Sequence, residues 1–139
     1  MIDINNTLQQ AYYTALSNAV TVPVYCNAVP SNVTDDSYIL FRSINNSDVS
    51  TNNSSDTDTS VTVEIHTYKD LTNGSGNVTS LANYVFGAIY PTPQFNLTVD
   101  GVQVVSTRLD GDRTEQYQMN NTRMYISRYL TFRHRIFIN

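Results

Sequence analysis

The end of the chain carries an uninterrupted stretch that predicts one long β-strand. Residues Met124–Ile138 contain neither Gly nor Pro and are rich in β-branched and aromatic side chains, which is typical of a strand. The even-numbered positions are mostly apolar, whereas the odd-numbered positions mix aromatic and basic side chains such as Tyr125, Tyr129, Arg133 and Arg135. The apolar face of such a strand packs into a core. The aromatic and cationic face is better suited to contact a nucleic acid, another protein or a ligand than bulk water.

The segments before this strand alternate between helical and strand-like patterns. Apolar residues recur at helical spacing over residues 3–19 and again over Val78–Ile89, and Pro91 and Pro93 end the second helix. Strand patterns cover five further segments, of which the last two form a tight hairpin around Asp100-Gly101. These segments are Val22–Asn27, Ser37–Ile44, Thr59–Lys69, Leu97–Val99 and Val102–Val105.

Two polar stretches are predicted to be loops. Asn45–Asp58 contains a single apolar residue and predicts a mobile loop at the tip of a long hairpin. Arg108–Asn121 is also polar and is expected to be a loop. The resulting order, α-β-β-β-α-β-β-β, shows no internal repeat and no linker. It predicts a single domain over residues 1–139 of the α+β class, a mainly antiparallel β-sheet with two helices packed on one face.

The composition and the distribution of charge favour contacts between copies of the chain. Only 14% of the residues are charged, and Asn, Ser and Thr are abundant. Uncharged polar groups cost less to desolvate than charges, which suits an assembly subunit, although a general preference of the source organism for Asn and Thr explains the composition equally well. Up to Thr107 there are two basic and nine acidic residues, whereas from Arg108 onward there are six arginines and three acidic residues. An acidic region and a basic region on one subunit favour head-to-tail contact between copies of the chain.

The sequence contains no pattern that predicts catalysis or metal binding. The two histidines, His66 and His134, have no ligand-type spacing to other donors and are expected to be structural, with His66 facing solvent or a partner. Nucleophile-elbow, phosphate-loop and calcium-loop motifs do not occur. We therefore expect no enzymatic activity, no metal and no cofactor. A signal peptide and a membrane-spanning segment are not expected either.

Taken together, several segments resemble the tail-completion, or tail-terminator, proteins of tailed bacteriophages. The segments that carry the resemblance are the helix Leu8–Leu16, Val22–Tyr25, the step from Pro30 to Tyr38-Ile39, the strand Val61–Tyr68 and the helix Asn77–Tyr90. The resemblance implies a small α+β virion protein that acts structurally. It also implies a location in the phage neck or tail, after assembly in the host cytoplasm.

The resemblance further implies a homo-oligomeric ring in the head-tail connector, a hexamer or a multiple of it. Such a ring, terminator-like or stopper-like, joins the portal or adaptor to the tail while genomic DNA passes through its lumen without specific binding. Under this hypothesis, nine residues are expected at subunit or partner contacts. They are Arg123, Arg128, Arg133, Arg135, Tyr125, Tyr129, Asn52, Asp56 and Asp58.

Two other functions remain open from the sequence. A small nucleic-acid-binding or regulatory module would stack bases on Tyr125 and Tyr129 and bind phosphates through Arg133 and Arg135. The negative net charge weighs against this alternative. A secreted adhesin-like or carbohydrate-binding domain would suit the tyrosines and amides, but no signal peptide is expected.

Overall fold

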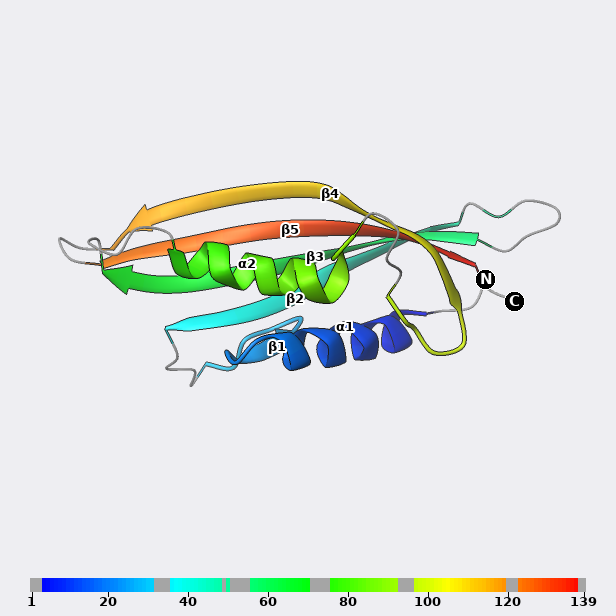
Figure 1. Ribbon diagram of the computed structural model, residues 1–139, viewed down its shortest axis with the longest axis horizontal. Helices are drawn as coiled ribbons and strands as arrows, with labels where there is room; N and C mark the ends of the chain where they lie inside the picture. Colours follow the sequence, from blue (N-terminus) through cyan, green and yellow to red (C-terminus); the bar gives the residue numbers. More distant parts are fainter. Residues whose placement is uncertain are drawn as a thin grey trace.

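The computed structural model describes residues 4–31, 36–48, 50, 56–70, 76–92, 97–119 and 123–137. Its elements follow the order α-β-β-β-α-β-β (Figure 1). They are α1 (Asn5–Ala19), β1 (Val24–Cys26), β2 (Ser37–Asp48), β3 (Asp56–Asp70), α2 (Gly76–Ile89), β4 (Gln103–Gln118) and β5 (Arg123–Phe137). The α+β class predicted from the sequence is confirmed.

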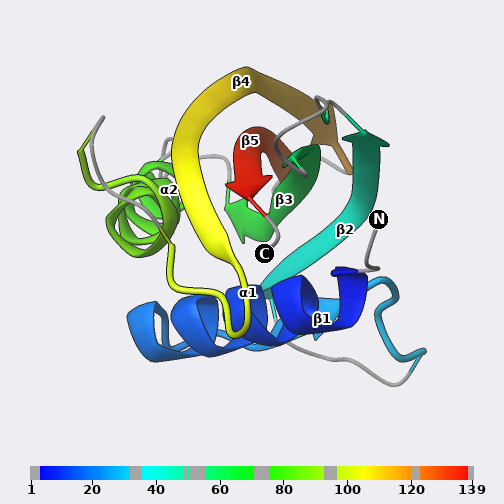
Figure 2. The same cartoon turned by 90° about the vertical axis from the view of Figure 1, so that its right-hand side faces the viewer.

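The strands form one sheet in the spatial order β1-β2-β3-β5-β4. The short strand β1 pairs in parallel with β2, and the other three pairs are antiparallel, so the sheet is mainly antiparallel as predicted. The last strand of the chain, β5, lies between β3 and β4 and is hydrogen-bonded along both sides. Viewed along the strands, the sheet is strongly twisted and β4 arches over its neighbours (Figure 2).

Both helices pack on the same face of the sheet, as the sequence predicted, and they also contact each other (Figures 1 and 2). The even-numbered positions of β5 face this layer, which confirms the alternation expected for the strand. Leu130, Phe132 and Ile136 are buried there. His134 is buried among them and contacts the Tyr12 hydroxyl from α1 and Thr107 Oγ1 from β4, the latter at 2.9 Å. Among the described residues no helix lies on the opposite side of the sheet, and we call this side the helix-free face.

The prediction for Arg108–Asn121 was wrong, because strand β4 runs to Gln118. This strand forms an edge of the sheet, and its second half is exposed on both faces, so no apolar alternation marks it. The expected strand at Leu97–Val99 was also wrong. Leu97 and Val99 are buried in an irregular segment that turns through Gly101, whose φ of 79° requires glycine-like freedom.

The polar segment Asn45–Asp58 is shorter as a loop than predicted. Strand β2 continues to Asp48 and β3 already begins at Asp56, so both ends of the segment are paired. Thr57 and Thr59 are buried on β3 beside their β5 partners Ile136 and His134, and the branched Cβ of threonine favours the strand. Residues 49 and 51–55, which include Asn52, lie outside the described residues, and their mobility stays a prediction.

Candidate functional site on the helix-free face

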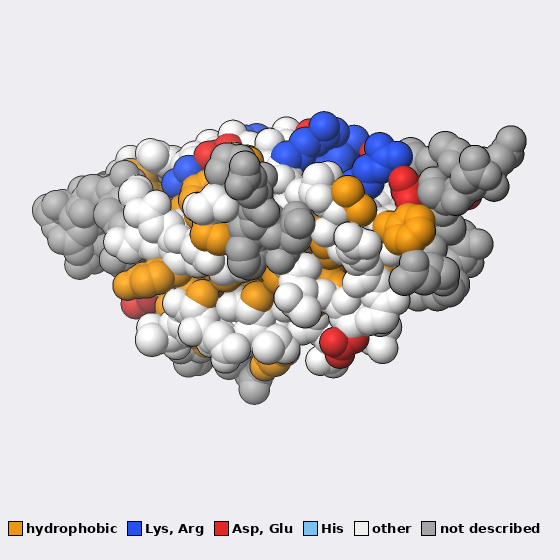
Figure 3. Space-filling view, turned by 45° about the vertical axis from the view of Figure 1, so that its right-hand side comes forward, with side chains coloured by type: hydrophobic (Ala, Val, Ile, Leu, Met, Phe, Trp, Pro, Cys, Tyr) orange, Lys and Arg blue, Asp and Glu red, His pale blue; other side chains and the backbone are white. Residues whose placement is uncertain are grey.

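The helix-free face collects most of the residues that the sequence singled out. Strand register places the odd-numbered positions of β5 beside the even-numbered positions of β3 on this side. Figure 3 shows basic side chains gathered in a patch along the upper edge of the molecule. Seven predicted contact residues lie on or border this face: Arg123, Tyr125, Tyr129, Arg133, Arg135, Asp56 and Asp58.

Arg128 lies on the opposite, helix-bearing side. Its guanidinium donates two hydrogen bonds to the Asp112 carboxylate on β4, at 3.0 and 2.7 Å, and lies 5.9 Å from the centroid of the Phe86 ring on α2. The ion pair lowers the pKa of Asp112 and raises that of Arg128. Arg128 therefore links β5, β4 and α2 within the subunit, and we do not assign it to the candidate contact surface.

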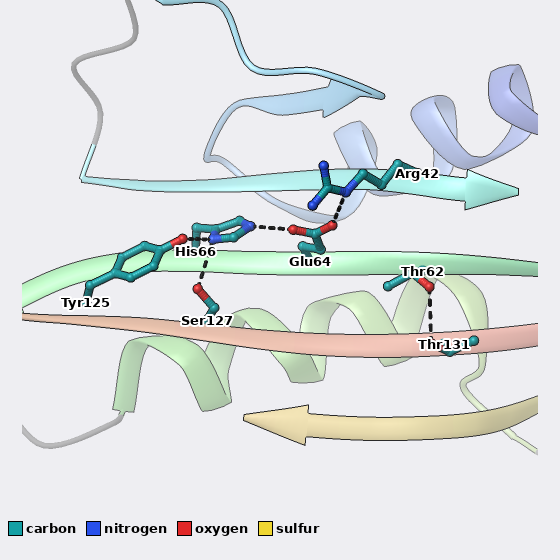
Figure 4. Close-up of polar contacts among 7 residues, drawn as sticks. All are labelled: Arg42, Thr62, Glu64, His66, Tyr125, Ser127 and Thr131. Carbon is teal, nitrogen blue, oxygen red and sulfur yellow. Dashed lines mark hydrogen bonds and ion pairs between the residues drawn. The ribbon is translucent and has the colours of Figure 1, made fainter. Parts of the chain in front are cut away.

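A buried polar network crosses the middle of the helix-free face (Figure 4). The Glu64 carboxylate pairs with the Arg42 guanidinium on one side and lies 2.9 Å from His66 Nε2 on the other. A carboxylate only accepts hydrogen bonds, so His66 Nε2 carries a proton and donates it to Glu64. The hydroxyls of Tyr125 and Ser127 both approach His66 Nδ1, Ser127 at 3.0 Å. His66 was expected to face solvent or a partner, and the first of these was wrong, because neighbouring side chains leave it only 6% exposed.

The chain of contacts from Ser127 through His66 to Glu64 has the connectivity of a nucleophile, a base and an orienting acid. Three observations show that it serves the structure and not a reaction. Ser127 and His66 are direct cross-strand partners, so their contact follows from sheet register. Ser127 is 1% exposed, which leaves its hydroxyl out of reach of a substrate. The hydroxyl of Tyr125 also occupies the same histidine nitrogen. We interpret the network as the means by which buried polar groups are satisfied.

Aromatic rings stack around this network at one end of the sheet. The ring centroid of His66 lies 4.9 Å from Tyr38 and 5.6 Å from Tyr125, and Tyr125 lies 4.7 Å from Tyr68. The Arg113 guanidinium lies 4.5 Å from the centroid of Tyr129. Burial raises the pKa of Tyr125 to about 12, so its hydroxyl stays protonated over the whole physiological range. The rings form a rigid, amphipathic surface of the kind that is common in protein interfaces.

Arginines and aspartates gather at the other end of the same face. Arg133 Nη2 lies 3.1 Å from Asp110 Oδ2, and Arg135 Nη2 lies 3.0 Å from Asp56 Oδ2. A pocket of about 140 Å³ opens among these side chains. Its lining consists of Asp58, Ser106, Arg108, Arg133 and Arg135. Within the described ranges, no group of three or more His, Cys, Asp or Glu side chains is arranged to hold a metal ion.

Sequence reasoning missed three members of this surface: Arg42, Arg108 and Asp110. Arg42 and Glu64 are cross-strand neighbours with opposite charges on adjacent predicted strands, a signal that the hairpin alignment contained. Asp110 lies in the segment that the sequence predicts to be a loop, and it occupies a bulge between Leu109 and Gly111 that turns it toward the arginines. No sequence signal marks that bulge.

Comparison with known proteins found a similar structure but no matching family profile or curated protein. The fold has a known counterpart. A chain in the structure of the virion of a native gene transfer agent particle superposes with a TM-score of 0.75 over 99% of both chains, at 18% sequence identity. At that identity, the similarity establishes a shared fold over the full length of the two chains.

No helix among the described residues has the length and apolar character needed to cross a membrane.

The network makes a direct prediction for stability. Replacing Arg42 by alanine leaves the buried Glu64 carboxylate with His66 as its remaining hydrogen-bond partner, and we expect a loss of about 1–2 kcal/mol in the free energy of unfolding. Urea denaturation at pH 7 measures it. The matched control is Arg108→Ala, because that exposed arginine is 3.9 Å from its partner Asp110 and should change stability by less than about 0.5 kcal/mol. Equal losses in both variants would contradict the assignment.

Proposed function

We propose that this chain is a structural virion protein that forms an oligomeric ring at the head-tail connector, terminator-like or stopper-like. In that ring it joins the portal or adaptor to the tail and lets genomic DNA pass through the lumen. The observation that carries the proposal is the match, over 99% of both chains, to a chain of a gene transfer agent virion. The resemblance of its sequence segments to phage tail-completion proteins supports the same role independently.

The proposed subunit contacts lie on the helix-free face. This face has no covering layer of helices, and it combines stacked tyrosines with paired arginines and aspartates. Aromatic and arginine side chains are enriched in protein interfaces. The two ends of the face differ in character, which suits a heterologous contact in which one end of a subunit meets the other end of the next. Repetition of such a contact closes into a ring when the rotation allows it.

The pairing of the arginines argues against the nucleic-acid alternative. All four arginines of β5 form ion pairs with carboxylates: Arg123 with Asp36, Arg128 with Asp112, Arg133 with Asp110 and Arg135 with Asp56. Tight binding to a phosphate backbone needs cationic charge that is free to neutralise phosphates. Paired arginines on a chain with a net charge of −4 supply little of it. A ring with such a surface would let DNA slide through its lumen without adhering to it.

Light scattering of the purified chain tests the proposal. We expect a discrete oligomer, a hexamer or a multiple of it, whose fraction rises with protein concentration between the micromolar and the millimolar range. We also expect no complex with duplex DNA at moderate salt. A strict monomer at every concentration, combined with salt-sensitive DNA binding, would contradict the ring and support the nucleic-acid alternative.

A further inference from the structure

The pocket at the arginine-rich end of the helix-free face is lined by two arginines, Arg108 and Arg133, whose donors are not all paired among the described residues. Arg133 Nε is buried and has no hydrogen-bond partner among the described residues. Arg108, at the same pocket, has one long ion pair of 3.9 Å, beyond hydrogen-bond distance. A buried donor without an acceptor costs about 1–3 kcal/mol, so such a group is normally satisfied by a partner in the working state. The chemistry that satisfies guanidinium donors best is an oxyanion.

We propose that this pocket receives a carboxylate side chain from the neighbouring copy of the chain. The inference rests on the proposed function, because it needs a ring in which copies meet head to tail. A volume of about 140 Å³ suits a single side-chain group rather than a drug-sized ligand. Of the three arginines in the lining, Arg133 and Arg135 are paired with Asp110 and Asp56, so Arg108, with its long ion pair, is the cation left to meet an incoming anionic group.

A second copy offers suitable carboxylates at the opposite end of its sheet. Asp36 and Glu115 have side chains that are 70% and 55% exposed, and each is held by one exposed arginine, Arg123 and Arg113 respectively. The backbone carbonyl of Asp36 accepts a hydrogen bond from the N–H of Tyr68, near the end of β3. The pocket lies beside Asp58, near the start of β3. Ten strand residues span about 33 Å, and Glu115 is seven residues, or about 23 Å, from Arg108 along β4, so neither carboxylate can reach the pocket of its own subunit. They can reach that of the next one.

The same spacing fixes the kind of contact. A pocket at one end and its ligand at the other make a heterologous interface, which propagates from copy to copy. Bidentate contact between a guanidinium and a carboxylate would also set the angle between neighbours. The excess of acidic residues up to Thr107 and of arginines after it agrees with Asp36 as the incoming carboxylate. A phosphate group from DNA has related chemistry, and the test below separates the two.

The test uses charge reversal and charge exchange in the full chain, with sedimentation velocity to measure assembly. Arg108→Glu should weaken association at least about tenfold, because it places like charges together. Either Arg108→Glu/Asp36→Arg or Arg108→Glu/Glu115→Arg should restore it, and the restoring pair identifies the carboxylate. The control is Gln10→Glu, which adds a negative charge at an exposed position of helix α1, on the other side of the sheet from the pocket. It should assemble to within about threefold of wild type. Circular dichroism confirms that each variant is folded.

Three outcomes would overturn the inference. Unchanged assembly of Arg108→Glu would do so while leaving the ring intact, and so would weakened assembly that neither exchange restores. Loss of duplex DNA binding in Arg108→Glu, with assembly unchanged, would assign the pocket to phosphate instead. If the wild-type chain is monomeric throughout, the ring itself fails, which is a different result from a ring that ignores the pocket.

Discussion

Lowering the pH from 7 to 4 is expected to reduce the free energy of unfolding by about 3 kcal/mol through His134 alone. Burial lowers the pKa of this histidine from 6.5 to about 4 in the folded chain. The unfolded chain binds the proton at its ordinary pKa, so the folded state loses stability as the pH falls below about 6.5. The full stabilisation is present above that pH, and a difference of 2.5 pKa units corresponds to roughly 3 kcal/mol.

The structural reason is that His134 is surrounded by groups that suit a neutral ring. It contacts the hydroxyls of Tyr12 and Thr107, and Thr59 is its cross-strand partner on β3. Burial raises the pKa of Tyr12 well above its usual value, so no phenolate is present to hold an imidazolium. Protonation therefore places an uncompensated charge in the core, between α1 and the sheet.

Urea denaturation at several pH values measures the effect, and His134→Gln is the control. Glutamine keeps a donor and an acceptor but does not titrate. We expect the variant to be less stable at pH 7 and to lack the part of the pH dependence that belongs to His134. A slope between pH 6.5 and 4 that is identical in both chains would contradict the assignment of this titration to His134.

Replacing Phe132 by alanine is expected to cost about 3–5 kcal/mol of unfolding free energy, the largest effect of any single change proposed for this chain. The ring is fully buried on β5 and packs edge-to-face against Phe86 of α2, with the ring centroids 6.1 Å apart. Its removal leaves a cavity between the sheet and the helix layer, and the lost apolar area adds to the cost of that cavity.

Thermal and urea unfolding of the monomeric chain measure this loss against Tyr117→Ala. Tyr117 lies on the edge strand β4 and is 68% exposed, so its removal should change stability by less than about 0.5 kcal/mol. A loss below about 1 kcal/mol in Phe132→Ala would mean that α2 does not pack on β5 as described.

The elements that sequence predicted well are those that bury one face. Strand β5 and helix α2 show their periodicity because alternate positions of the strand, and one side of the helix, lie in the core. The same rule explains the failure at β4. Its residues from Asp112 to Gln118 are exposed, so hydrogen bonds to β5 hold the strand in place without any apolar pattern. Pairing with a neighbour is a tertiary effect that local sequence does not record.

The candidate site was predictable to a similar degree. The odd-numbered positions of β5 faced away from the helices as expected, which brought Tyr125, Tyr129 and Arg133 to one surface. Arg128 was harder to assign, because it has the same charge as its neighbours but an even-numbered position, and the ion pair with Asp112 fixes it on the other side. The pocket around Arg108 depends on the bulge at Asp110, which only the folded sheet reveals.

The most direct test of the central claim is electron microscopy of the purified, assembled chain. The account predicts closed rings of uniform rotational symmetry around a lumen wide enough to admit a DNA duplex, with the helix-free face of each subunit in the contact between neighbours. Two-fold dimers, open filaments or dispersed monomers under conditions in which the chain is folded would contradict it.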